Sequence, residues 1–144
     1  MKGPDLFSPS PRPVTFTVLG EPITWKRVDR DPKFGHSFIP RDVRNAEKAI
    51  AWAYIAAGGR MLQGAVVLGC TFYLAGRCSA PELDPRDLDN LMKLVADALQ
   101  KHAYQNDRRI VGYYPAPFKL LDKSNPRTVI TVAPWPHPPP APLT

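Results

Sequence analysis

The chain has 144 residues, which suits one compact domain with a single core and is short for two. Its 19 Lys and Arg residues outnumber 13 Asp and Glu residues, and the net charge of +6 favours an anionic partner such as nucleic acid over an acidic small substrate. Cys70 and Cys78 have no other Cys or His at metal-ligand spacing, so the composition argues against a zinc site and a disulfide framework.

The ends of the chain differ in composition from its middle. The N-terminus lacks the apolar segment of a signal peptide, and no apolar run reaches the roughly 18 residues of a membrane span, so we expect a cytoplasmic protein. Proline concentrates in "SPSPRP" (8–13) and "APWPHPPPAPLT" (133–144). This predicts a flexible N-terminal segment over 1–13, a folded domain over 14–133 and a Pro-rich tail over 134–144.

The first half of the domain predicts a strand, a basic loop and a helix. "VTFTVLG" (14–20) alternates apolar and polar residues, as a half-buried strand does. The next loop places cations around Trp25 and Phe34, which suits contact with phosphates and bases. These cations are Lys26, Arg27, Arg30 and Lys33. "SFIP" (37–40) predicts a short returning strand, and apolar residues at helical spacing predict a helix over 41–57.

The second half predicts a strand, a helix and two further strands. "GAVVLGCTFYLAG" (64–76) is typical of a central strand, and an apolar stripe predicts a helix over about 89–102. "RRIVGYYPAPFK" (108–119) and "RTVITVA" (127–133) predict two strands joined by a turn. The order β-α-β-α-β-β predicts an α+β (mixed α/β) domain, in which two helices cover a mixed sheet of about four or five strands.

Three aspartates stand at the start of the second helix, in "DPRDLDN" (84–90). Helical residues two apart point about 200° away from each other, so Asp87 and Asp89 converge only if the helix starts near Asp89 and Asp87 stays on extended chain. A purely structural alternative makes Asp84 the helix cap, with Pro85 at the first helical position. That alternative leaves Asp87 and Asp89 only partly explained.

A further carboxylate, Asp107, follows the helix in "YQNDRRI" (104–110). Carboxylates gathered from separate elements repel unless a cation joins them, and oxygen ligands with room for water suit Mg2+ or Mn2+. Such an ion generates an attacking hydroxide and neutralises charge on a phosphodiester. Lys93, one turn after Asp89, is spaced to reach the phosphate, although from spacing alone an ion pair with Asp89 or Asp97 is the commoner role.

Three segments together resemble the RusA family of Holliday junction resolvases: "GEPITWKR" (20–27), "DLDNLMKLVADAL" (87–99) and "NDRRIV" (106–111). The similarity runs from about Phe16 to Val132. It implies a homodimer that nicks two strands of like polarity in four-way DNA, with Mg2+ as cofactor. Many members of the family come from phages and prophages.

The resemblance also assigns roles to residues. It implies that Asp87, Asp89 and Asp107 bind the metal and that Lys93 is the catalytic lysine. Lys26, Arg27 and Arg30 are implied to contact DNA.

One position departs from the family pattern. The family commonly has two adjacent aspartates before the strand, and the first of these is Asn106 here, which offers an oxygen without a charge. Asn90 and Asp97 are expected to orient the metal ligands and Lys93.

Two other functions fit the same residues. One is a non-catalytic nucleic-acid-binding module whose aspartates only cap a helix. The other is a less selective nuclease for branched DNA such as flaps and forks. Binding of Mn2+ separates the module from the enzymes, whereas the sequence does not discriminate between the two nucleases.

Overall fold

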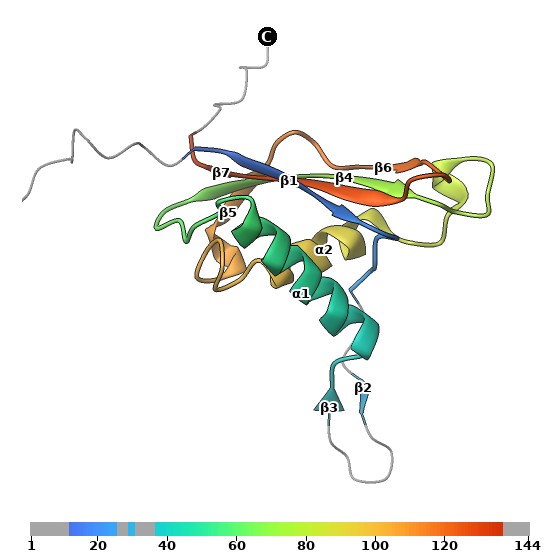
Figure 1. Ribbon diagram of the computed structural model, residues 1–144, viewed down its shortest axis with the longest axis horizontal. Helices are drawn as coiled ribbons and strands as arrows, with labels where there is room; N and C mark the ends of the chain where they lie inside the picture. The colour runs from blue at the N-terminus through green and yellow to red at the C-terminus, as the bar shows by residue number, and fades with distance from the viewer. Residues whose placement is uncertain (1–11, 26–28, 31–36, 137–144) are drawn as a thin grey trace, which may run out of the picture.

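The computed structural model describes residues 12–25, 29–30 and 37–136. Within them, two α-helices lie on one face of a five-stranded mixed sheet (Figure 1). The helices are α1 (Arg41–Ala56) and α2 (Leu88–Ala98). The sheet strands are β1 (Val14–Leu19), β4 (Val66–Leu74), β5 (Ile110–Tyr113), β6 (Phe118–Leu121) and β7 (Arg127–Pro134). The predicted α+β class is confirmed.

Strand β4 lies at the centre of the sheet, as its apolar sequence predicted. It pairs antiparallel with β7 from Val66↔Pro134 to Tyr73↔Arg127, and β7 pairs antiparallel with β1. Along its other edge, β4 pairs parallel first with β5 and then with β6. The strand order is therefore β1-β7-β4-β5, and β6 follows β5 along the same edge of β4.

The predicted strand over 108–119 is divided into β5 and β6. Between them, Pro115 and Pro117 lack the N–H that a sheet ladder needs. The chain also passes very close to β4 here, because a Cβ added at Gly69 would lie 2.5 Å from the Tyr114 carbonyl oxygen. One edge of β4 therefore receives two short parallel strands.

Helix α2 is one turn shorter than the predicted range of 89–102. After Ala98 the chain turns so that Leu99, Ala103 and Tyr104 are buried, and the Tyr104 hydroxyl donates a hydrogen bond to the Ala96 carbonyl at 2.7 Å. Lys101 has a positive φ of 68° in this turn. Burial of these side chains outweighs continuation of the helix, and the turn directs the chain back toward β5.

The interpretation of Asp84 as the cap of α2 is wrong. Asp84 is instead the C-cap of a short 3-10 helix, η1 (Pro81–Leu83), and α2 begins at Leu88 with Asp87 as its N-cap. Asp87 has extended backbone angles (φ −75°, ψ 138°), and Asp89 lies in the first turn. This is the arrangement that convergence of the two carboxylates requires.

The core lies between the sheet and the two helices. Helix α2 contributes Leu91, Leu94 and Val95 to the core, and α1 contributes Ile50 and Tyr54. A separate ribbon, β2 (Asp29–Arg30) with β3 (Ser37–Phe38), projects beyond α1 (Figure 1) and confirms the short strand predicted in "SFIP". In the described part of the chain, no helix has the length and apolar character needed to cross a membrane.

Candidate active site

A pocket of about 360 Å3 lies between α2 and the edge strand β5. Helix α2 contributes Asp89, Lys93 and Ala96 to its lining, and the chain around β5 contributes the rest. These are Asp107, Ile110, Val111, Gly112 and Tyr113. Two of the predicted metal ligands and the predicted catalytic lysine, which come from separate elements, therefore meet at one pocket.

Lys93 is held between two partners. Its ammonium lies 4.8 Å from the centre of the Trp25 ring and 3.8 Å from Asp97 Oδ2, one turn further along α2. Trp25 is itself anchored, because its backbone N–H donates to the Asn90 carbonyl at 3.0 Å. Lys93 therefore forms the ion pair with Asp97 that the spacing predicts, and it also lies on the wall of the pocket.

Asp107 begins a 3-10 helix, η2 (Asp107–Arg109), just before β5. Its N-cap is Asn106, whose side-chain oxygen accepts from the Arg108 backbone N–H at 3.1 Å. Asn106 therefore has a capping role at this turn, which a neutral amide performs as well as an aspartate.

Gln100 connects the two sides of the site, although its sequence position did not indicate this. Its side-chain amide nitrogen donates to Asp97 Oδ1 at 3.4 Å, and its side-chain oxygen accepts from the Asp107 backbone N–H at 3.3 Å. A single Gln near the end of a predicted helix carries no distinctive pattern. Its position signals a role only once the turn after α2 is known.

Negative charge is concentrated around the pocket. Burial raises the pKa of Asp97, the Lys93 ammonium opposes that rise, and the Asp107 carboxylate adds to it. Mutual repulsion of this kind is relieved by a cation, and Mg2+ commonly takes one or two protein carboxylates together with waters and substrate phosphates. The exposed carboxylates of Asp89 and Asp107 fit that ligand set.

Asp87 is placed differently from the other two aspartates. It is exposed, makes no side-chain hydrogen bond to the helix it caps, and is not among the residues that line the pocket. Over residues 12–25, 29–30 and 37–136, no three Asp, Glu, His or Cys side chains are grouped closely enough to hold a metal ion. Asp89 and Asp107 are thus brought together, and the third expected ligand is not.

The proposed DNA-contacting residues fall mostly outside the described residues. This applies to Lys26, Arg27 and Lys33. The backbone of Arg30 belongs to β2, in the ribbon that projects beyond α1 (Figure 1).

The loop that leads into α2 is fixed by charged side chains. Arg86 donates to Glu21 Oε2 at 2.8 Å and to the Pro22 carbonyl at 3.2 Å, after the end of β1. From β6, the Lys119 ammonium donates to the carbonyl oxygens of Asp84 and Arg86 at 2.9 and 2.7 Å. These bonds hold the residues immediately before Asp87, so the start of α2 is tied to the sheet.

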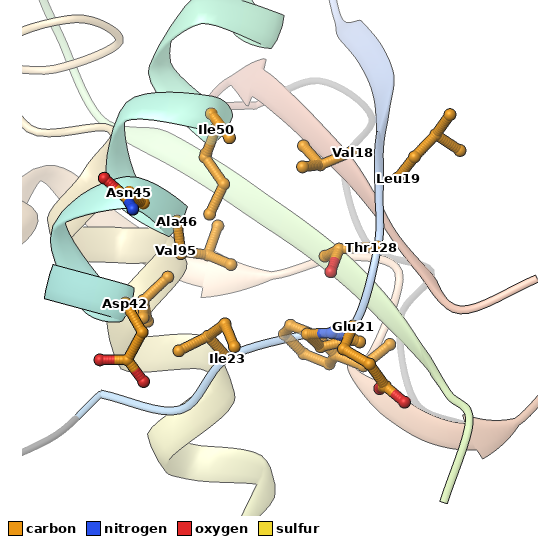
Figure 2. A pocket seen from close by; sticks show the side chains of 15 residues that line it. Val18, Leu19, Glu21, Ile23, Asp42, Asn45, Ala46, Ile50, Val95 and Thr128 are labelled. Carbon is orange, nitrogen blue, oxygen red and sulfur yellow. The ribbon is translucent and has the colours of Figure 1, made fainter.

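A second pocket, of about 350 Å3, lies between α1 and the end of β1. Figure 2 shows Val18 and Ile50 facing the same space, whereas Glu21 points away from α1. Most of the lining side chains are apolar, with Ile23, Ala46 and Val95 among them. The lining of this pocket includes two carboxylates, Glu21 and Asp42, but no lysine, so it is the weaker candidate for phosphodiester chemistry.

This basic α+β domain has two exposed carboxylates and a lysine on one pocket, which are the side chains expected of an enzyme that cleaves nucleic acid. The family model of endodeoxyribonuclease RusA matches residues 20–133, and the chain belongs to that family. Membership implies Holliday junction resolvase nuclease activity, with branched DNA as substrate. A search of curated proteins found no match.

Proposed function

We propose that the protein is a Mg2+-dependent endodeoxyribonuclease that resolves four-way DNA junctions by paired, symmetric nicking as a homodimer. The observation that carries the proposal is the meeting of Asp89, Lys93 and Asp107 at one pocket. Asp89 and Lys93 lie on α2, and Asp107 lies on η2. The packing of the fold does not by itself require charged side chains from these two elements to meet. Membership of the RusA family supports the same activity.

Asp89 and Asp107 would hold Mg2+, or Mn2+ in its place, at the mouth of this pocket. When bound, the divalent ion supplies a water of lowered pKa and neutralises charge on the phosphate. Asp87 is the proposed third ligand: its carboxylate makes no capping bond, and it stands two residues before Asp89. Gln100 and Asp97 would orient Asp107, since ligand geometry depends on the groups behind the ligands.

Lys93 would contact the scissile phosphate. Trp25 and Asp97 restrict where its ammonium can lie, so little reorganisation is needed as charge develops on the phosphate oxygens. Asn90 supports this arrangement through its backbone, because its carbonyl fixes the Trp25 segment against α2.

The wider assembly follows from the substrate. Lys26, Arg27, Arg30 and Lys33 would contact DNA phosphates. A four-way junction offers two equivalent strands, and a two-fold dimer presents two equivalent active sites to them. The expected setting is the cytoplasm of a bacterial or phage-infected cell.

The test is cleavage of a synthetic mobile junction by wild-type protein and Asp89→Asn in Mg2+, with a linear duplex of the same sequence alongside. The variant should lose nicking while binding the junction in Ca2+ with nearly wild-type affinity. Glu82→Gln is the matched control, since Glu82 is an exposed carboxylate on η1 outside the pocket. Equal nicking by Asp89→Asn and wild type would refute the assignment.

Homodimerisation has a separate measurement. Sedimentation of the free protein at micromolar concentration should give twice the mass of the 144-residue chain. A monomer both free and on the junction would contradict paired nicking by a dimer.

A further inference from the structure

Gly112 opens a space on the wall of the active-site pocket. A Cβ added there would meet no heavy atom within 4 Å, and the backbone of Gly112 is not in the left-handed region. Gly69 in β4 is different, because a Cβ there would collide with the Tyr114 carbonyl. The chain's own packing and conformation therefore require glycine at 69 and do not require it at 112.

Gly112 lies at the same pocket as the groups proposed for catalysis. The pairing of β5 with β4 is irregular at this point, because Ile110 pairs with Val66 and Gly112 pairs with the adjacent Val67. Gly112 lines the same pocket as Asp89, Lys93 and Asp107. Glycine weakens a strand and often marks the close approach of a ligand or another backbone.

Tyr113 adds an exposed aromatic side chain to this wall. It lines the pocket and is 53% exposed. Its position is fixed by β4, since Tyr113 pairs with Leu68 and the next N–H, of Tyr114, donates to the Leu68 carbonyl at 3.1 Å. An exposed aromatic on a rigid strand offers a stacking surface to any base.

We propose that Gly112 and Tyr113 form a nucleotide subsite that selects branched DNA. Gly112 makes room for the sugar-phosphate backbone of the strand to be cut, and Tyr113 stacks on a base exposed at the branch point. Bases within a linear duplex are covered on both faces, so stacking on Tyr113 favours a branch. This inference rests on the proposed function, because it takes a DNA strand as the ligand of the pocket.

The first test is Gly112→Ala, paired with Gly64→Ala. Gly64 is exposed, a Cβ there would also meet nothing within 4 Å, and it lies outside the pocket. Gly112→Ala should unfold at the wild-type temperature or higher, yet bind a four-way junction in Ca2+ at least fivefold more weakly and nick it more slowly in Mg2+. Gly64→Ala should match wild type in all three measurements. Wild-type binding and nicking by Gly112→Ala would overturn the subsite.

The second test compares Tyr113→Leu with Tyr113→Phe, on a junction that carries 2-aminopurine at the branch point. Wild type and Tyr113→Phe should quench its fluorescence in Ca2+, whereas Tyr113→Leu should lose the quenching and bind about tenfold more weakly. Phe118→Leu is the control, because Phe118 is 58% exposed on β6 and does not line the pocket. Equal quenching by Tyr113→Leu and wild type would overturn the stacking role.

The outcomes separate the two proposals. If wild type nicks junctions and ignores the substitutions at Gly112 and Tyr113, only the subsite is wrong. If wild type binds and quenches in Ca2+ but never nicks in Mg2+, the nuclease proposal is wrong while the subsite stands. If wild type neither binds nor nicks a junction, both are wrong.

Discussion

Arg86 and Asp84 form a two-pronged ion pair immediately before α2. Arg86 Nε donates to Asp84 Oδ1 at 2.9 Å, and Nη2 donates to Oδ2 at 2.8 Å. The Asp84 side chain is only 3% exposed, so its charge depends on Arg86 for compensation. The aspartate that first resembled a helix cap thus anchors the loop that delivers Asp87 and Asp89.

Replacing Arg86 by Met should destabilise the fold by about 3 kcal/mol, because the buried Asp84 carboxylate then lacks its partner. Urea unfolding at pH 7 measures this loss. Arg108→Met is the control, since Arg108 is exposed and its side chain lies on η2, away from Asp84. An equal free energy of unfolding for Arg86→Met and wild type would show that the pair contributes nothing.

The same pair predicts a dependence of stability on acid. The hydrogen bonds that Arg86 donates to Asp84 lower the pKa of the Asp84 carboxyl from 3.8 to about 2. A carboxyl group whose pKa is lower in the folded state than in the unfolded state stabilises the fold at a pH above its unfolded-state pKa. This contribution is lost as the pH falls through the folded-state pKa. The stability difference between wild type and Asp84→Asn should therefore shrink by about 2 kcal/mol between pH 5 and pH 2. A difference that is constant over this range would contradict the prediction.

Lys93→Met should slow single-turnover nicking about a hundredfold, since a positioned cation is lost from the transition state. Junction affinity in Ca2+ should change much less, because DNA binding draws on many phosphate contacts. Lys48→Met is the control on α1, where the lysine is exposed and outside this pocket. If affinity falls as much as the rate does, Lys93 acts in binding only.

Mg2+ should raise the melting temperature of the wild-type protein. At ten times its dissociation constant, a ligand of the folded state adds about 1.4 kcal/mol of stability. Asp89→Asn and Asp107→Asn should lose this gain, and Glu82→Gln should keep it. Asp87→Asn tests the third ligand: an unchanged response to Mg2+ in that variant would exclude Asp87 from the site.

Gln100→Met should weaken the apparent Mg2+ affinity in the nicking assay about tenfold, because Asp107 loses the amide that connects it to Asp97. Excess Mg2+ should restore most of the maximal rate, which a general loss of folding would not allow. Gln105→Met, at an exposed glutamine in the same turn, should behave as wild type. An unchanged Mg2+ dependence for Gln100→Met would rule out the connecting role.

Local pattern was enough to predict much of the fold. The helix over 41–57 follows from apolar spacing, and the central strand within 64–76 follows from β-branched and aromatic residues bounded by glycines. Both signals depend only on neighbours along the chain. The opposed directions of Asp87 and Asp89 within a helix likewise required Asp87 to lie on extended chain, and it does. The resemblance of three segments to the RusA family is confirmed by the match over 20–133.

The sequence by itself determined the helices, the central strand and the start of α2 near Asp89, since each depends on residues a few positions apart. Only the tertiary structure decided the burial of Asp84, the division into β5 and β6, and the part played by Gln100. It also brought Asp107 to the pocket beside Asp89. These depend on the order in which strands pair along β4, and long-range pairing leaves no periodic pattern in the chain.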